Sequence, residues 1–128
     1  MTKQYIGTKI ITAYPLVKDD QDGYAVIYAD GYTSWSPKAV FEEAYRLCDA
    51  MTFGLAIEAL RRGLSVARSG WNGKGMWLSM QVPDEHSKMS LPYLYLNYPT
   101  DAINTPGARV PWQASQTDVL AEDWEIVS

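Results

Sequence analysis

The chain of 128 residues has one cysteine, Cys48, and one histidine, His86. A single cysteine cannot form an intrachain disulfide, and these two residues alone cannot make a cluster of soft metal ligands. No apolar stretch approaches the roughly 20 residues that span a bilayer, and residues 1–5 do not lead into the hydrophobic stretch of a secretory signal. We therefore expect a cytoplasmic protein that contacts no membrane and holds no metal or cofactor.

An excess of basic charge is lacking as well. The chain has 11 lysine and arginine residues against 15 aspartate and glutamate residues, a formal net charge of -4. Surfaces that bind DNA or RNA need clustered cations to displace the counterions of the phosphates. The charge thus argues against a DNA or RNA partner, and any site for a phosphate group must be local.

The chain does contain enough apolar material for one domain. Its 47% hydrophobic and 20% charged residues are ordinary for a globular protein. The patterns along it predict an α+β fold, a small antiparallel sheet with two helices, with an N-terminal ββα extension packed on it. We place this β-hairpin plus helix at residues 1–50 and a ligand-binding domain at residues 51–128, and we expect one compact unit.

The N-terminal half reads as strand, hairpin and helix. Residues 5–14 are rich in isoleucine and threonine and end at Pro15, which predicts a strand. The runs 24–29 and 32–35 flank Asp30-Gly31, a dipeptide that favours a type I′ hairpin turn. Ser36 and the proline after it then predict the capped start of a helix through about residue 48.

The second half begins with a helix whose two ends are marked. Thr52 is the expected N-cap of a helix over residues 53–62, and Gly63 its left-handed stop. Strands are expected at residues 64–68, 76–82, 91–98, 109–112 and 124–127. A turn or short helix should occupy residues 117–121.

A glycine-flanked loop carries the strongest signal for a binding site. Between Gly70 and Gly75 it presents an indole, an amide and an ammonium group, from Trp71, Asn72 and Lys74. These groups suit a nucleotide, because stacking a base on one aromatic ring contributes about 1–3 kcal/mol. Lys74 and Arg68 could then meet a pyrophosphate. The alternative is an Asn-Gly hairpin turn in which Trp71 caps the core and both cations are solvated.

Two further segments supply candidate contacts. Residues 91–98 alternate, so their leucines should face the core while Tyr93 lies on the opposite face, available to a ligand or partner. The alternative is an ordinary two-sided sheet. Trp112 and four residues after it, Ser115, Gln116, Thr117 and Asp118, are further candidate ligand contacts. The hydroxyl, amide and carboxylate groups of these four residues could bind ribose hydroxyls and base edges. The alternative is a capped turn with Thr117 as N-cap and with Glu122 and Asp123 solvated. We expect the segment Glu122-Asp123-Trp124 to close the fold.

A catalytic interpretation of the loop around His86 fails, because nothing orients this histidine against a nucleophile. The acidic residues 19–22 likewise lack the terminal glutamate of a calcium loop. We therefore expect no catalytic residue.

Three motifs in order give a more specific indication. They are F-G-x-A-x-x-x-L-x-x-G at residues 53–63, V-A-R-x-G-W-N-G-K-G-M at 66–76 and W-x-A-S-Q-x-D-x-L-A-E-D-W at 112–124. In these the chain resembles the Thoeris anti-defense two family of phage proteins. The resemblance implies a non-catalytic sponge that sequesters cyclic ADP-ribose isomers made by a bacterial immune system in the infected host cell. It also implies a homotetramer with signal pockets between protomers, and some members also hold cyclic oligonucleotides, such as cyclic di- or trinucleotides.

Two other classes of protein remain as alternatives. One is a phosphodiesterase that degrades the signal, although the chain offers no His/Asp metal cluster for it. The other is a phage protein-interaction module in which residues 1–50 carry the binding.

Overall fold

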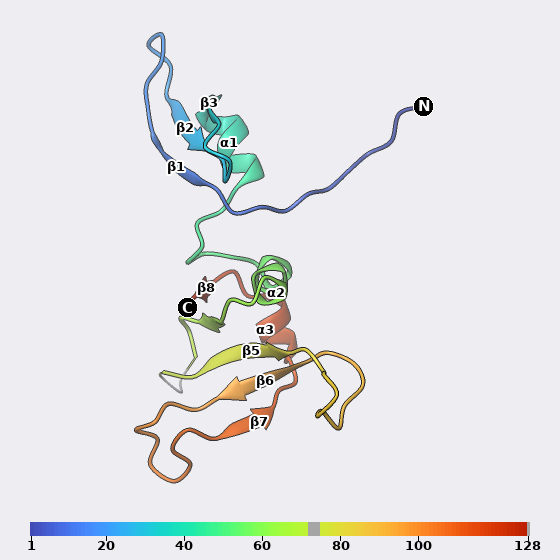
Figure 1. Ribbon diagram of the computed structural model, residues 1–128. Coiled ribbons are helices and arrows are strands. Elements are labelled where there is room, and N and C mark those ends of the chain that lie inside the picture. The colour runs from blue at the N-terminus through green and yellow to red at the C-terminus, as the bar shows by residue number, and fades with distance from the viewer. Residues whose placement is uncertain (72–74, 128) are drawn as a thin grey trace. The chain divides into compact units, whose positions relative to one another are not determined.

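The computed structural model describes residues 1–71 and 75–127. The chain divides into two compact units, Met1–Arg46 and Leu47–Ser128 (Figure 1). Both combine antiparallel strands with helix, so the predicted α+β class is confirmed. The packing of residues 1–50 on the rest stays a prediction.

The N-terminal unit is an antiparallel sheet in the order β1-β2-β3, followed by a helix. Its elements are β1 (Thr12–Pro15), β2 (Gly23–Ile27), β3 (Thr33–Pro37) and α1 (Lys38–Ala44). The strand predicted over residues 5–14 begins only at Thr12. The reason lies in the register, because Thr12 pairs with Ile27, the last residue of β2. Residues 5–11 therefore run past the end of their partner strand.

The predicted hairpin between β2 and β3 is confirmed, but its predicted type I′ turn is wrong. Of the two central residues, Gly31 has a positive φ of 87° and Asp30 does not. The Gly31 amide donates to the Tyr28 carbonyl at 2.9 Å, and the Tyr28 amide donates to the Tyr32 carbonyl at 2.8 Å. This is a three-residue loop with a glycine in the left-handed region, a common alternative to the two-residue turn.

Two consecutive positive φ angles occur instead between β1 and β2. They belong to Asp19 and Asp20, at 51° and 62°. The flanking Lys18 and Gln21 exchange two backbone hydrogen bonds of 2.9 Å. Aspartate tolerates the left-handed region better than most residues, so the acidic loop forms the tight turn that the sequence suggested for Asp30-Gly31.

The helix α1 is shorter than predicted, and Ser36 does not cap it. The N-cap position is Pro37, which makes no side-chain cap bond, and the Ser36 hydroxyl donates to the Pro37 carbonyl at 3.3 Å. The helix ends before Tyr45, whose backbone is extended. None of its residues is buried, and short helices without tertiary packing are marginal. Phe41 nevertheless stacks on Tyr24 with ring centroids 4.1 Å apart.

The second unit begins with α2 (Phe53–Arg61), whose two predicted ends are confirmed. The Thr52 hydroxyl accepts a hydrogen bond from the Leu55 amide at 3.4 Å. At the other end Gly63 has a φ of 82°. The Leu64 amide reaches the Ala59 carbonyl at 3.1 Å, and the Gly63 amide donates to Leu60 at 3.0 Å, which is the Schellman arrangement.

The sheet of this unit is antiparallel in the order β7-β6-β5-β4-β8. Its elements are β4 (Val66–Arg68), β5 (Trp77–Gln81), β6 (Tyr93–Asn97), β7 (Arg109–Pro111) and β8 (Trp124–Ile126). All five were predicted and are slightly shorter than expected. The short helix α3 (Gln116–Leu120) precedes β8. Since β8 pairs with β4, the end of the chain returns to the strand that precedes the glycine-flanked loop.

The core lies between this sheet and α2, which packs on β4, β5 and β8 and touches α3 (Figure 1). Its buried residues are Met51, Ala56, Ala59, Leu60, Val66, Leu78 and Trp124. Leu94 and Leu96 of β6 pack against it, as their alternation predicted. Tyr93 therefore lies on the sheet face away from α2.

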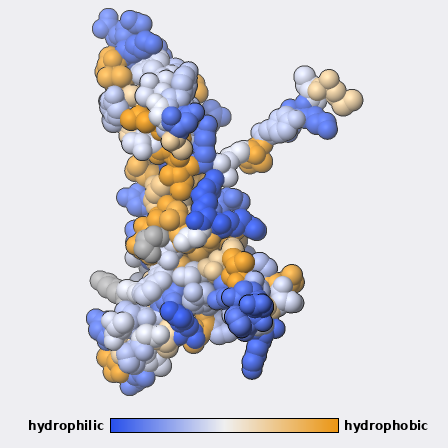
Figure 2. All heavy atoms as spheres, in the orientation of Figure 1, coloured by the Kyte–Doolittle hydropathy of each residue, from blue (hydrophilic) through white to orange (hydrophobic). Residues whose placement is uncertain are grey.

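The face of the molecule seen in Figure 2 carries both hydrophobic and hydrophilic residues. Large apolar side chains are exposed in the N-terminal segment, where Tyr5 and Ile6 are 91% and 100% exposed. Among the helices of the described residues, none combines the length and the apolar content that crossing a bilayer requires.

Candidate functional site

The candidate site forms where the end of β4 meets the segment from α3 to β8. Arg68 is the last residue of β4 and pairs with Trp124, the first residue of β8. The residues after Arg68 enter the glycine-flanked loop, and those before Trp124 belong to the α3 segment. Pairing of the two strands thus brings together residues that lie about 50 positions apart.

Asp118, in the first turn of α3, is the centre of the polar contacts. Its Oδ1 accepts hydrogen bonds from Arg68 Nη1 at 2.9 Å and from Trp71 Nε1 at 3.2 Å. Its Oδ2 accepts from the Ser115 amide at 3.1 Å and the Ser115 hydroxyl at 2.9 Å. Ser115 is the N-cap of α3 and completes a capping box with Asp118. Thr117, the alternative N-cap suggested by the sequence, lies inside the helix.

Asp123 makes the second set of contacts. Its Oδ1 accepts from Arg68 Nε at 2.9 Å, and its Oδ2 accepts from the Gly70 amide at 2.8 Å and the Ser69 hydroxyl at 3.4 Å. A Cβ on Gly70 would lie 2.8 Å from Asp123 Oδ2, closer than carbon and oxygen atoms normally approach. Glycine at position 70 therefore permits this carboxylate to hold the start of the loop.

The charges in this network stabilise one another. Burial alone would raise the pKa of Asp118, but the hydrogen bonds from Ser115, Trp71 and Arg68 outweigh it and hold that pKa at about 2. The Arg68 hydrogen bond is the main cause that lowers the pKa of Asp123, and both carboxylates raise the pKa of Arg68. All three groups are therefore charged throughout the physiological range.

An aromatic cluster lies beside the ionic groups. The half-buried Trp71 meets the buried Trp124 edge to face, with ring centroids 5.4 Å apart at 80°. The ring centroid of Trp112 lies 6.3 Å from that of Trp71 and 6.1 Å from that of Trp124. The ring of Phe53 in α2 contacts both Trp112 and Trp124. The Trp124 indole donates to the Asp118 backbone carbonyl at 2.9 Å. Each aromatic pair of this kind adds about 0.5–1.5 kcal/mol beyond its buried area.

The structure brings together five of the residues predicted from the sequence: Arg68, Trp71, Trp112, Ser115 and Asp118. Gln116 and Thr117 lie in the same first turn of α3 with exposed side chains. Asn72 and Lys74 lie outside the described residues. Ligand contact by these residues stays a prediction. Arg68 already forms ion pairs with the carboxylates of Asp118 and Asp123.

Tyr93 does not join this group, because it points to the opposite face of the sheet. There it lines a shallow hollow of about 150 Å³ with Gln81, Tyr95, Arg109, Val110 and Pro111. A ligand on Trp71 and one on Tyr93 of the same unit would thus lie on different faces.

Asp123 is the contact that sequence reasoning missed. Its position in Glu122-Asp123-Trp124 suggested only that this segment closes the fold. The available signal was Gly70, a small residue two positions after the end of β4, where a backbone amide can meet a carboxylate. Nothing local connects it with Asp123, 53 residues later.

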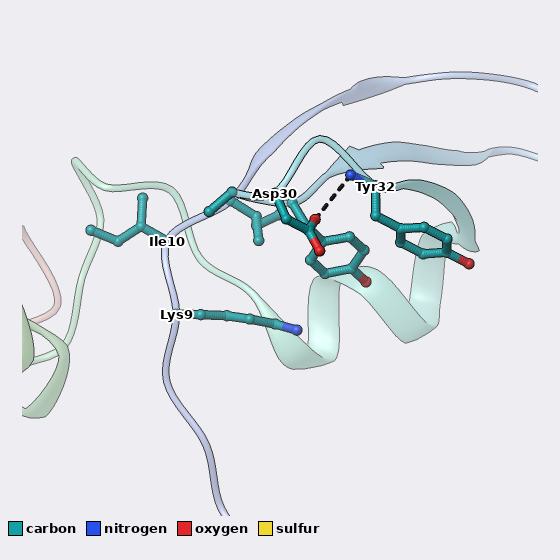
Figure 3. Close-up of a pocket in the computed structure, with 7 residues that line it drawn as sticks. Lys9, Ile10, Asp30 and Tyr32 are labelled. Atoms are coloured by element: carbon teal, nitrogen blue, oxygen red, sulfur yellow. Dashed lines mark hydrogen bonds between the residues drawn. The ribbon is translucent and has the colours of Figure 1, made fainter.

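A separate hollow of about 500 Å³ lies on the N-terminal unit (Figure 3). Lys9 reaches from the N-terminal segment toward the hairpin loop, with Nζ 4.5 Å from the centroid of the Tyr28 ring. On the loop, Asp30 accepts a hydrogen bond from the Tyr32 amide at 2.9 Å. The ammonium of Lys9 and the carboxylate of Asp30 both line this hollow. Its charge therefore favours neither an anionic nor a cationic ligand.

The fold and the site together define a small α+β domain in which an internal ionic network holds Ser69, Gly70 and Trp71 after β4. Residues 51–127 match the Tad2-like family model, described as a Thoeris anti-defense 2-like domain. The chain is also 45% identical over 85 residues to Thoeris anti-defense 2 of Bacillus phage SP01, a match that covers 61% of this chain and 96% of that protein. The chain therefore belongs to the Thoeris anti-defense 2-like family, as its three motifs predicted, and this membership supports a phage anti-defense role.

Proposed function

We propose that this protein binds a cyclic ADP-ribose isomer, made as a signal by a bacterial immune system, and sequesters it without breaking it down. The observation that carries the proposal is the placement of Trp71. Its indole is half-buried and hydrogen-bonded to Asp118, at the start of the loop that the family motif includes. A ring held in one orientation loses little further entropy when a base stacks on it.

The groups around Trp71 suit the other parts of such a ligand. Gln116 and Thr117 expose an amide and a hydroxyl on the turn that carries Asp118, and both can bind ribose hydroxyls or base edges. Lys74, in the same loop sequence as Trp71, is our candidate for the pyrophosphate. The net charge of -4 makes a local cation of this kind necessary for an anionic ligand.

The proposed assembly is a homo-oligomer, a tetramer by the resemblance, with pockets completed by a second protomer. A ligand with two ribose units and a pyrophosphate offers more polar groups than one small domain can surround. Tyr93 and the sheet face that carries it would then reach the ligand from a neighbouring copy.

The proposed place of action is the cytoplasm of the infected cell, where the signal is made. Cyclic di- or trinucleotides are proposed as a second ligand class.

The experiment that tests the proposal is calorimetric titration of the purified protein with cyclic ADP-ribose and its linkage isomers, followed by heat denaturation and chromatography of the released ligand. The proposal predicts tight binding of at least one isomer and recovery of that isomer intact. Recovery of a hydrolysed product would instead support a signal-degrading phosphodiesterase. No binding of any isomer, with a protein partner captured through residues 1–50, would support the interaction module.

A further inference from the structure

The carboxylate of Asp118 is fully engaged by groups of its own chain. An ionised carboxylate offers about four acceptor positions on its two oxygens. Asp118 accepts from Arg68 Nη1, Trp71 Nε1, the Ser115 amide and the Ser115 hydroxyl, at 2.9 to 3.2 Å. A ribose hydroxyl could bind this carboxylate only by displacing one of these donors.

Arg68 is held between two carboxylates. Its Nη1 and Nε donate to different carboxylates, both at 2.9 Å, and its side chain is 15% exposed. The two carboxylates exceed its single positive charge, so the group as a whole carries one negative charge. A pyrophosphate approaching Arg68 would meet that net negative charge and would have to break a short ion pair.

We infer that Asp118 is a positioning residue, which fixes the Trp71 indole for stacking, and that Arg68 compensates the carboxylates of Asp118 and Asp123 instead of binding the ligand's phosphates. This inference rests on the proposed function, because it assigns roles within the same site. Under this inference Trp71 contacts the ligand, whereas Arg68 and Asp118 do not contact it directly.

The geometry explains why a positioning group is needed. Trp71 lies three residues beyond the end of β4, and a tryptophan outside a strand or helix can rotate about its side-chain bonds. The Asp118 bond to Nε1 and the edge contact with Trp124 restrict that rotation from two sides. Asp123 holds the residues just before Trp71, because its Oδ2 accepts hydrogen bonds from the Ser69 hydroxyl and the Gly70 amide.

The test is nuclear magnetic resonance of the tryptophan indole N–H groups in the full chain without ligand, combined with calorimetric titration. The variants are Asp118→Asn, with the exposed Asp101→Asn as the matched control. Trp124 provides an internal control, since its indole donates to the backbone carbonyl of Asp118, which the substitution retains. Indole signals are assigned with Trp71→Phe and Trp124→Phe.

We expect Asp118→Asn to move the Trp71 indole signal, to leave the Trp124 signal close to its position, and to weaken binding of the cyclic ADP-ribose isomer at least tenfold. Asp101→Asn should change neither quantity. If the Trp71 signal stays in place while binding is lost, Asp118 contacts the ligand directly and the inference is wrong. If the signal moves and the affinity is unchanged, the positioning role is wrong. Because the signals are recorded without ligand, a wild-type protein that binds no isomer refutes the proposed function separately.

Two further variants keep the test decisive. Should Asp118→Asn not fold, Ser115→Ala removes one donor and keeps the carboxylate, and it should shift the Trp71 signal in the same direction and weaken binding severalfold. An unmoved signal would contradict the inference. Arg68→Gln tests the phosphate contact, because it removes the positive charge, and a lost contact between that charge and a phosphate would flatten the salt dependence of affinity. We expect the same salt dependence as wild type, and a flatter one would show that Arg68 meets the pyrophosphate.

Discussion

Arg68 and Asp118 stand 50 residues apart in the sequence, and their Nη1 and Oδ1 atoms lie 2.9 Å apart in the structure. Their side chains are 15% and 13% exposed, so the pair is largely withdrawn from solvent. Removing one partner of such a pair leaves a charge uncompensated and typically costs about 3 kcal/mol or more. Because Trp71 donates to the same Asp118 oxygen, the link between β4 and α3 also fixes the candidate ligand-binding ring.

Replacing Trp71 by alanine should weaken binding of the cyclic ADP-ribose isomer by about 5- to 150-fold, the equivalent of about 1–3 kcal/mol of stacking. It should also lower the melting temperature, because Trp71 packs against Trp124. Calorimetry and circular dichroism measure the two effects. Tyr32→Ala removes an exposed aromatic ring from the hairpin loop of the N-terminal unit, and it should leave affinity within about twofold. Unchanged affinity in a folded Trp71→Ala protein would remove this residue from the site.

Acid should weaken the fold through Asp118. Its pKa in the folded protein is about 2, against an ordinary value of 3.8. A depressed folded pKa contributes stability that is fully present above the unfolded value and is lost as pH falls through the folded one. The wild type should therefore exceed Asp118→Asn in free energy of unfolding above about pH 4, and that advantage should shrink by about 2 kcal/mol toward pH 2. Urea denaturation across this range measures it, and a constant difference would show that Asp118 titrates normally.

Replacing Gly70 by alanine should displace Asp123, because the new Cβ would lie 2.8 Å from its Oδ2 atom. We expect a loss of about 1–2 kcal/mol of stability for the disturbed charged hydrogen bonds, together with weaker ligand binding. Gly54→Ala is the matched control. Its Cβ would meet nothing closer than the Thr52 hydroxyl at 4.0 Å, and alanine favours a helix by about 0.5–1 kcal/mol. Equal stabilities of the two variants would contradict the role given to Gly70.

The N-terminal unit should be required by the whole protein, although the family match covers only residues 51–127. Its Ile27, Trp35, Phe41 and Tyr45 are half-buried, and a unit of three short strands and one helix has little core of its own. A truncated protein starting at Leu47 retains the Cys48 carbonyl that accepts from Ile126, yet we expect it to aggregate or to change oligomeric state. Native mass spectrometry and light scattering measure this. Wild-type oligomer and affinity in the truncated protein would show that residues 1–46 are an independent appendage.

The elements with local signals could be predicted from the sequence. The ends of α2 follow from Thr52 and Gly63, whose side-chain and backbone preferences act within a few residues. The leucine and tyrosine faces of β6 follow from simple alternation.

The turns and the site network depended on longer-range pairing. Ile27 pairs with Thr33, a register that leaves too many residues between the strands for a two-residue Asp-Gly turn. The contacts of Arg68 with Asp118 and Asp123 required the pairing of β4 with β8. The motif residues could thus be named from sequence, whereas their engagement with one another could not.

The most direct measurement of the central claim is a titration of the full-length protein with cyclic ADP-ribose and its linkage isomers, followed by recovery of the bound ligand after heat denaturation. The account predicts that one isomer binds tightly to the wild type, much more weakly to Trp71→Ala, and comes back chemically unchanged. Failure of every isomer to bind, or recovery of a cleaved product, would contradict it.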